Sequence, residues 1–231
     1  MTALSKNARV AGLLYVLSSL FGLVRLIYIP GALFVHGNAA ATSSNIASRE
    51  LLFRFGIVSY LLCNILWIFA ILAFYRLLKG VDQALAVLMV ILGLMVTPIS
   101  LVNTVNDVAA LLFARGADFL ALFDKAQREA LVVLFLNLHH QLDLADDSLG
   151  LFFIPFGLLV YKSRFLPRIL GLWLMVVCFA YLALSFTGLL CPAYEAKVLT
   201  IAQPVLFGEV AVMLWLLIMG SKEKPLVAAS S

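Results

Sequence analysis

The sequence predicts an all-α integral membrane protein, a six-transmembrane-helix bundle with both termini cytoplasmic. Of its 231 residues, 64% are hydrophobic and only 12% are charged, which is more apolar surface than a soluble domain of this size can bury. Six apolar runs are each long enough to cross a bilayer core of about 30 Å. Basic residues gather in alternate loops. We therefore expect one membrane domain over residues 1–231, with no room for a separate soluble domain.

Each expected span corresponds to one apolar run. The first run follows Lys6 and Arg9, and it is too long for a cleaved signal sequence, so we expect a retained helix. The stretch 128–161 would measure about 51 Å as one helix, so its first part is expected to form an external helical extension. The spans are expected at about 8–28, 51–75, 84–113, 140–161, 167–190 and 198–220.

The alternation of basic loops predicts the orientation. By the positive-inside rule, the loops richer in Lys and Arg face the cytoplasm, together with both termini. The segment 37–48, rich in Ala, Ser and Asn, then becomes an external loop. The basic residues on the cytoplasmic side would be Lys6, Arg9, Arg76, Lys79, Lys162, Arg164, Arg168, Lys222 and Lys224.

Several function classes lack their sequence signals. The net charge of +4 comes from scattered residues rather than from a long basic cluster, so no nucleic-acid partner is expected. There is no Gly-rich phosphate loop and no nucleophile elbow, which disfavours nucleotide-driven transport by this chain. The three cysteines form no CxxC pair, so a disulfide framework is not expected.

A stripe of titratable residues follows one face of the expected fourth span. On a helical wheel, His139, Asp143 and Asp146 lie close together, with His140 and Asp147 at the edge, and the five cover about one third of the circumference. Ionised side chains at this depth cost several kcal/mol in contact with lipid. The stripe should therefore face a neighbouring helix or water.

A second polar arc lies on the expected third span, where Ser100, Asn103, Asn106 and Asp107 share one face. Other spans also carry ionisable residues. Arg25 and Arg54 lie about one turn from the external ends of the first two spans, and Glu209 lies near the middle of the sixth. We expect one outward-facing polar cavity, with Glu209 as its floor. Ligand-binding or titratable residues would be Arg25, Arg54, Asn103, Asp107, His139, Asp143, Asp146 and Glu209.

Three interpretations of the stripe stay open. His139, Asp143 and Asp146 have a spacing that suits one divalent metal ion, which could activate water. Alternatively, the groups titrate along a proton or cation path. In the third interpretation they sit hydrated at the headgroup level, and Arg25 and Arg54 extend to the headgroups in the same way.

Six short segments keep a characteristic order along residues 8–220: 11–15 (AGLLY), 52–58 (LFRFGIV), 75–78 (YRLL), 136–139 (LNLH), 165–171 (FLPRILG) and 208–209 (GE). Together they resemble the bacterial membrane family catalogued as domain of unknown function 4386. The resemblance implies a multi-pass inner-membrane protein of bacterial type, from a family without an established activity.

Two departures from the family pattern affect the expected site. Tyr60 stands where the resemblance leads us to expect an acidic residue, so Arg54 is expected to have no partner in its own helix. Asp143, Asp146 and Asp147 occupy a stretch expected to be mostly apolar. Chemistry built on these aspartates would then belong to this protein rather than to the family.

The leading hypothesis is non-enzymatic: binding or translocation of a small polar or cationic ligand in the cytoplasmic membrane of a bacterium. The first alternative is an intramembrane metal-dependent hydrolase, with the metal on His139, Asp143 and Asp146. The second is a non-catalytic membrane partner subunit. No cofactor is expected apart from the divalent metal of the first alternative. The expected partners are the lipid bilayer and the small ligand.

Overall fold

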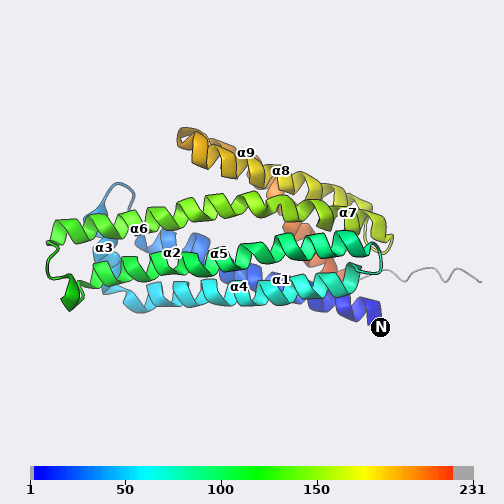
Figure 1. Cartoon of the computed structure of the whole chain (residues 1–231), viewed down its shortest axis with the longest axis horizontal. Coiled ribbons are helices and arrows are strands. Elements are labelled where there is room, and N and C mark those ends of the chain that lie inside the picture. Colours follow the sequence, from blue (N-terminus) through cyan, green and yellow to red (C-terminus); the bar gives the residue numbers. More distant parts are fainter. Residues whose placement is uncertain (1–2, 221–231) are drawn as a thin grey trace, which may run out of the picture.

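The computed structural model describes residues 3–220, and these are almost entirely helical, without a strand (Figure 1). Six of the helical stretches in this range are long and apolar enough to cross a membrane. The predicted all-α, six-helix membrane fold is thus confirmed. The six stretches are Leu4–Leu33, Glu50–Leu78, Gln83–Arg115, Lys125–Ser163, Arg168–Leu190 and Pro192–Met219.

Several of these stretches consist of more than one helical element. The first contains a π-helical turn, the fourth is interrupted by a 3-10 turn, and the last ends in a second π-helical turn. In order, the elements are α1 (Ala3–Leu23), η1 (Val24–Tyr28), α2 (Ile29–Leu33), α3 (Ala39–Ser48), α4 (Glu50–Leu78), α5 (Gln83–Arg115), η2 (Asp118–Leu120), α6 (Lys125–Asp146), η3 (Asp147–Phe152), α7 (Phe153–Ser163), α8 (Arg168–Leu190), η4 (Pro192–Tyr194), α9 (Glu195–Leu214) and η5 (Trp215–Met219).

The helices form a closed ring of neighbours. α1 packs against α4, α4 against α5, and α5 against α6. Both α6 and α7 contact α8, α8 contacts α9, and η5 closes the ring against α1. In Figure 1, α4, α5 and α6 run side by side, whereas α8 and α9 run at an angle to them.

Two hydrophobic clusters stabilise the bundle at different levels. One cluster is centred on buried side chains such as Phe74, Phe156 and Leu174, from α4, α7 and α8. The other includes Ile29 and Phe53, from α2 and α4, with residues of α3, α5 and α6. Buried polar side chains of α4, α5 and α6 lie, along each helical stretch, between the residues of the first cluster and those of the second. The hydrophobic clusters therefore hold a polar layer inside the bundle.

The prediction of an external loop at 37–48 is wrong, because residues Ala39–Ser48 form the helix α3. The side chain of Asn38 caps this helix by accepting a hydrogen bond from the Ala41 N–H. Alanine, a strong helix former, opens the segment. Ile46 is fully buried in the second hydrophobic cluster. The segment thus carries a capping residue and an apolar contact, two helix signals that outweigh its polar composition.

The fourth span begins as a helix at Lys125, three residues before the expected extension. Asp124 and Gln127 form a capping box that fixes this start. Beyond Asp146 the chain tightens into η3 before α7. Pro155 lacks the N–H that would bond to the carbonyl of Leu151, which explains a break in the α-helical pattern here.

Two of the basic residues predicted on the cytoplasmic side lie together beside the α7–α8 turn. Arg76, in the last turn of α4, and Lys79, its C-cap, line a cavity of about 300 Å³ together with Phe165, from the α7–α8 turn. Lys222 and Lys224, which the sequence assigns to the same side, lie outside the described residues. The orientation of this end toward the cytoplasm stays a prediction.

Candidate functional site

A buried ion pair joins the first and third spans. Arg25 Nε donates to Asp107 Oδ2 at 3.0 Å, and a terminal N–H of the same guanidinium donates to Oδ1. Asp107 is 0% exposed and Arg25 is 5% exposed. Arg25 belongs to the π-helical turn η1, a local widening of the helix that is frequent at functional sites. The two-point contact fixes the position of both helices and both charges.

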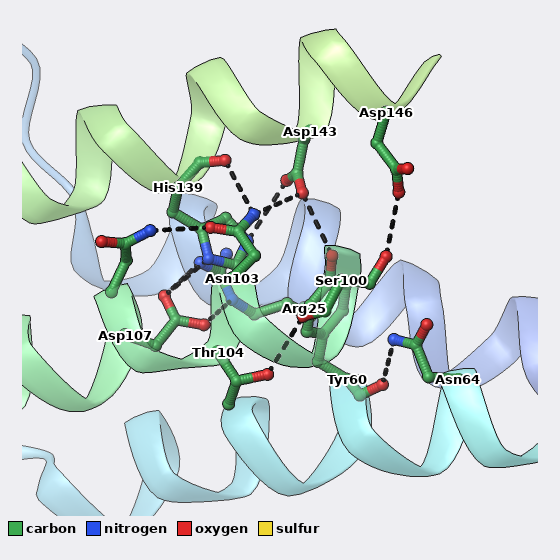
Figure 2. A network of polar contacts seen from close by, with 11 residues as sticks. Arg25, Tyr60, Asn64, Ser100, Asn103, Thr104, Asp107, His139, Asp143 and Asp146 are labelled. Carbon is green, nitrogen blue, oxygen red and sulfur yellow. Dashed lines mark hydrogen bonds and ion pairs between the residues drawn. The ribbon is translucent and has the colours of Figure 1, made fainter. Parts of the chain in front are cut away.

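His139 of α6 lies between Asp107 and Asp143 (Figure 2). Its Nδ1 is 3.3 Å from Asp107 Oδ1, and its Nε2 is 3.2 Å from Asp143 Oδ2. The residue is 2% exposed, and within the described residues neither ring nitrogen makes an aligned hydrogen bond. A neutral imidazole has one N–H, whereas the protonated ring has two. A protonated His139 would therefore direct an N–H toward each carboxylate.

Asp143 also receives donors from two other helices. Asn103 Nδ2 of α5 donates to Asp143 Oδ1 at 2.9 Å and to the carbonyl oxygen of His139 at 3.0 Å. Tyr60 of α4 donates its hydroxyl to the same Oδ1 at 3.1 Å. We call the following six residues the buried network: Arg25, Tyr60, Asn103, Asp107, His139 and Asp143. These residues come from η1, α4, α5 and α6, and Figure 2 shows how their side chains converge.

The next aspartate along α6 lies beyond this network. Asp146 Oδ2 accepts a hydrogen bond from Ser100 Oγ at 2.9 Å. Its other oxygen, Oδ1, is buried and has no hydrogen-bond partner within residues 3–220. His140 turns away from the network, toward Glu195 Oε1 at 2.9 Å. The stripe predicted on α6 thus divides among three environments.

Glu209 of α9 is held by two tyrosines. Tyr15 Oη donates to Oε2, and Tyr181 Oη donates to Oε1, both at 2.6 Å. The tyrosines come from α1 and α8, so the carboxylate joins three helices. Neither hydroxyl carries a compensating positive charge.

A cavity of about 170 Å³ connects Glu209 with the end of α6. Three carboxylates line it, and no Lys, Arg or His side chain is among its lining residues. The rest of its wall is aromatic and aliphatic. The lining residues are Trp67, Val96, Asp146, Asp147, Leu149, Gly150, Phe152, Phe153, Tyr181 and Glu209. We call this space the acidic cavity.

Arg54 lies apart from the buried network. It donates from Nε to Glu50 Oε1 at 2.6 Å, one helical turn earlier on α4. The expectation that Arg54 has no partner in its own helix is therefore wrong. No acidic residue follows Arg54 within α4, whereas Glu50 precedes it by one turn. The other Glu50 oxygen, Oε2, is 3.1 Å from Arg115 Nε, so this ion-pair cluster joins α4 to the end of α5.

The three residues predicted as metal ligands, His139, Asp143 and Asp146, have different partners. His139 faces Asp107 as well as Asp143, whereas Asp146 bonds to Ser100. In the part of the chain that the structure describes, no three His, Cys, Asp or Glu side chains gather as a metal-binding group. The geometry gives the hydrolase alternative no support.

Sequence reasoning left several cavity residues out of the site. Asp147 lies at the edge of the stripe on the helical wheel, outside the predicted set of site residues, and Trp67 carries no periodic signal. Tyr15 and Tyr181 lie well inside their helices, although tyrosine in membrane proteins is enriched at the interfaces. This unusual depth is the signal that would have identified them as partners of a buried polar group.

Comparison with known proteins identifies a family over nearly the whole chain. The family model described as domain of unknown function (DUF4386) matches residues 10–220. The chain belongs to this family. No curated protein and no solved structure matches it. With six candidate spans and this family match, the protein is a multi-pass helical membrane protein of a family whose function is not known.

Proposed function

We propose that this DUF4386 protein binds a small cation in the acidic cavity and carries it across the bacterial cytoplasmic membrane. The observation that carries the proposal is the lining of the cavity. Asp146, Asp147 and Glu209 border one space that has no basic side chain in its wall. Carboxylates confined in a membrane bundle are unfavourable without a compensating charge. A bound cation supplies that charge.

The buried network supports this function by fixing the cavity. Asp143 and Asp146 are about one turn apart on α6. The contacts of Asp143 with Tyr60 and Asn103 tie this part of α6 to α4 and α5. Asp146 is thereby held at the edge of the cavity. The network positions the binding site, and its centre at Asp107 and His139 is almost fully buried.

The partner-subunit alternative predicts a different location for the polar residues. A subunit without its own site would present its polar face on the outside of the bundle. Here Arg25, Asp107 and His139 face one another in the interior. This inward arrangement favours a site within the chain.

Cation binding can be tested on the detergent-purified protein by thermal unfolding. The probes are chloride salts of Na⁺, K⁺, Ca²⁺, Mg²⁺, tetramethylammonium and choline at matched ionic strength. A ligand at about 100 times its Kd stabilises the folded state by about 2.7 kcal/mol. We expect at least one probe to raise the Tm of the wild type, and Asp147→Asn and Glu209→Gln to abolish that rise.

The matched control is Asp118→Asn, which removes an exposed carboxylate in η2 and should keep the response. Uptake of the stabilising probe into proteoliposomes then tests translocation. If neither the inorganic nor the organic cations shift the Tm of the wild type, the proposed function is wrong. It is also wrong if Asp147→Asn and Glu209→Gln respond to the probes as the wild type does.

A further inference from the structure

We propose that the cation is an organic ammonium compound, recognised by both its charge and its apolar carbons. This inference rests on the proposed function and names the ligand class of the same cavity. Its starting point is the composition of the wall. Besides the three carboxylates, the acidic cavity is lined by four aromatic rings, from Trp67, Phe152, Phe153 and Tyr181.

A bare metal ion suits this wall poorly. Hard cations such as Ca²⁺ take about six to eight oxygen ligands, and Mg²⁺ requires an octahedral set. Within residues 3–220, no three acidic, His or Cys side chains come together as such a group. An alkylammonium ion needs far fewer oxygens. One or two carboxylates neutralise its charge, while aromatic and aliphatic side chains contact its carbons.

The aromatic rings are held in place before any ligand binds. Trp67 donates its indole N–H to the carbonyl oxygen of Gly93 at 2.8 Å, and its ring meets the edge of Phe152 with centroids 5.4 Å apart. Phe153 and Tyr181 lie parallel, with centroids 5.5 Å apart. Because the indole N–H is already bonded, Trp67 has no donor left and can offer the cavity only its π-surface. A preorganised aromatic wall loses little conformational entropy on binding.

The size of the cavity limits the ligand. Its volume of about 170 Å³ is close to that of an engineered protein cavity of about 150 Å³ that holds benzene. A compound of roughly six to eight non-hydrogen atoms is therefore the right size. Choline and tetramethylammonium fall near this range.

The carboxylates divide into two roles. Both oxygens of Glu209 already accept tyrosine hydroxyls. Asp146 has one buried oxygen without a partner among the described residues. The carboxylate of Asp147 lines the cavity and accepts no hydrogen bond within residues 3–220. Asp146 and Asp147 are thus the groups that contact the ammonium, whereas the tyrosine hydroxyls already occupy both oxygens of Glu209.

The decisive experiment compares ligand classes by isothermal titration calorimetry on the detergent-purified protein. The probes are choline, tetramethylammonium, Na⁺, K⁺ and Ca²⁺, with 3,3-dimethyl-1-butanol as the neutral isostere of choline. We expect at least one organic cation to bind ten times more tightly than any inorganic cation, and no binding of the neutral isostere. Asp147→Asn should abolish binding, whereas the exposed control Asp118→Asn should retain it.

Two further variants test the aromatic wall. Phe153→Leu removes one ring and should weaken organic-cation binding about fivefold to thirtyfold, the equivalent of about 1–2 kcal/mol of cation–π interaction. Val96→Phe fills the cavity from α5 and should exclude choline. The second variant tests the proposal even if Phe153→Leu fails to fold.

The outcomes separate this inference from the proposed function. If inorganic cations bind in an Asp147-dependent manner and organic cations do not, the inference is overturned and the proposed function stands. Equal binding of choline and its neutral isostere overturns recognition of charge. Unchanged choline affinity in a folded Phe153→Leu and in Val96→Phe overturns the aromatic site. If neither class of cation binds, both proposals are wrong.

Discussion

The buried network and the acidic cavity contain similar residue types but treat negative charge differently. In the network, Asp107 and Asp143 contact a guanidinium, an imidazole, an amide and a hydroxyl. Arg25 compensates Asp107 from within the chain, and His139 lies between the two carboxylates. In the cavity, the donors to Asp146 and Glu209 are uncharged hydroxyls. The comparison indicates that the network is structural and that the cavity awaits a positive charge from outside.

The largest expected effect comes from breaking the network at Asp107. Asp107→Leu leaves the buried Arg25 without its carboxylate, and removal of one partner of a buried pair costs about 3–5 kcal/mol. We expect this loss in the free energy of unfolding, measured by denaturant titration in detergent. The double variant Arg25→Met/Asp107→Leu should recover most of it, because it removes both charges. An Asp107→Leu protein as stable as the wild type would contradict a structural role for the network.

A smaller loss should follow from Asn103→Ala. Asn103 donates to the carbonyl oxygen of His139 and to Asp143, and a hydrogen bond to a charged group is worth about 1.5–3 kcal/mol. The matched control is Asn106→Ala, on the same helix, because the Asn106 side chain donates to Asn103 and does not contact Asp143 within the described residues. Denaturant titration of both variants under the same conditions compares their free energies of unfolding. Equal losses in the two variants would show that the hydrogen bonds of Asn103 to Asp143 and to the His139 carbonyl add no stability.

In the acidic cavity, removal of a carboxylate should raise the free energy of unfolding rather than lower it. Asp147→Asn removes one of three carboxylates that share the acidic cavity, so it relieves repulsion in the absence of a ligand. We expect the free energy of unfolding to rise by about 0.5–2 kcal/mol, the usual range for a stabilising substitution. The same variant should lose stabilisation by a cationic ligand. A destabilised Asp147→Asn would place Asp147 in the same class as Asp107 and remove the contrast between the two regions.

The sequence predicts the spans well because the bilayer imposes a simple rule of about 20 apolar residues per helix. Pairing within the bundle is harder to predict. Helical wheels place Asn103, Asp107 and Asp143 on polar faces, but they do not show that Arg25 reaches Asp107 while Arg54 turns to Glu50. That choice depends on helix rotation, and at Arg25 it also depends on the π-helical turn.

The acidic cavity is still less visible in the sequence. Its wall combines Trp67, Asp147, Tyr181 and Glu209, from four separate elements. Each residue alone is compatible with an ordinary membrane helix. Only the packing of α8 and α9 against the rest of the bundle brings them around one space, and no periodicity in the sequence records that packing.

The smallest expected effect concerns Asp82, a carboxylate outside the spans. It is paired but not deeply buried, so it separates the contribution of charge pairing from that of burial. Asp82 caps α5 by accepting the N–H of Leu85 at 3.1 Å, and it accepts a hydrogen bond from Lys162 Nζ at 3.1 Å. These donors, the Leu85 N–H first and then Lys162, hold the pKa of Asp82 below its usual value. A lowered pKa in the folded state means that the stabilisation is present above the pKa of the unfolded chain, about 3.9. It is lost as the pH falls through the folded value.

Asp82→Asn should therefore lower stability slightly at neutral pH and flatten its decline in acid, because asparagine keeps a capping oxygen but has no charge to lose. Thermal unfolding of both proteins between pH 3 and pH 7 measures the difference, with Asp118→Asn as the exposed control. Parallel pH profiles for wild type and Asp82→Asn would contradict the assigned partners. Because Asp82 is paired like Asp107 but lies at the surface, a small effect here beside a large one at Asp107 would show that burial, rather than pairing alone, makes the network important for stability.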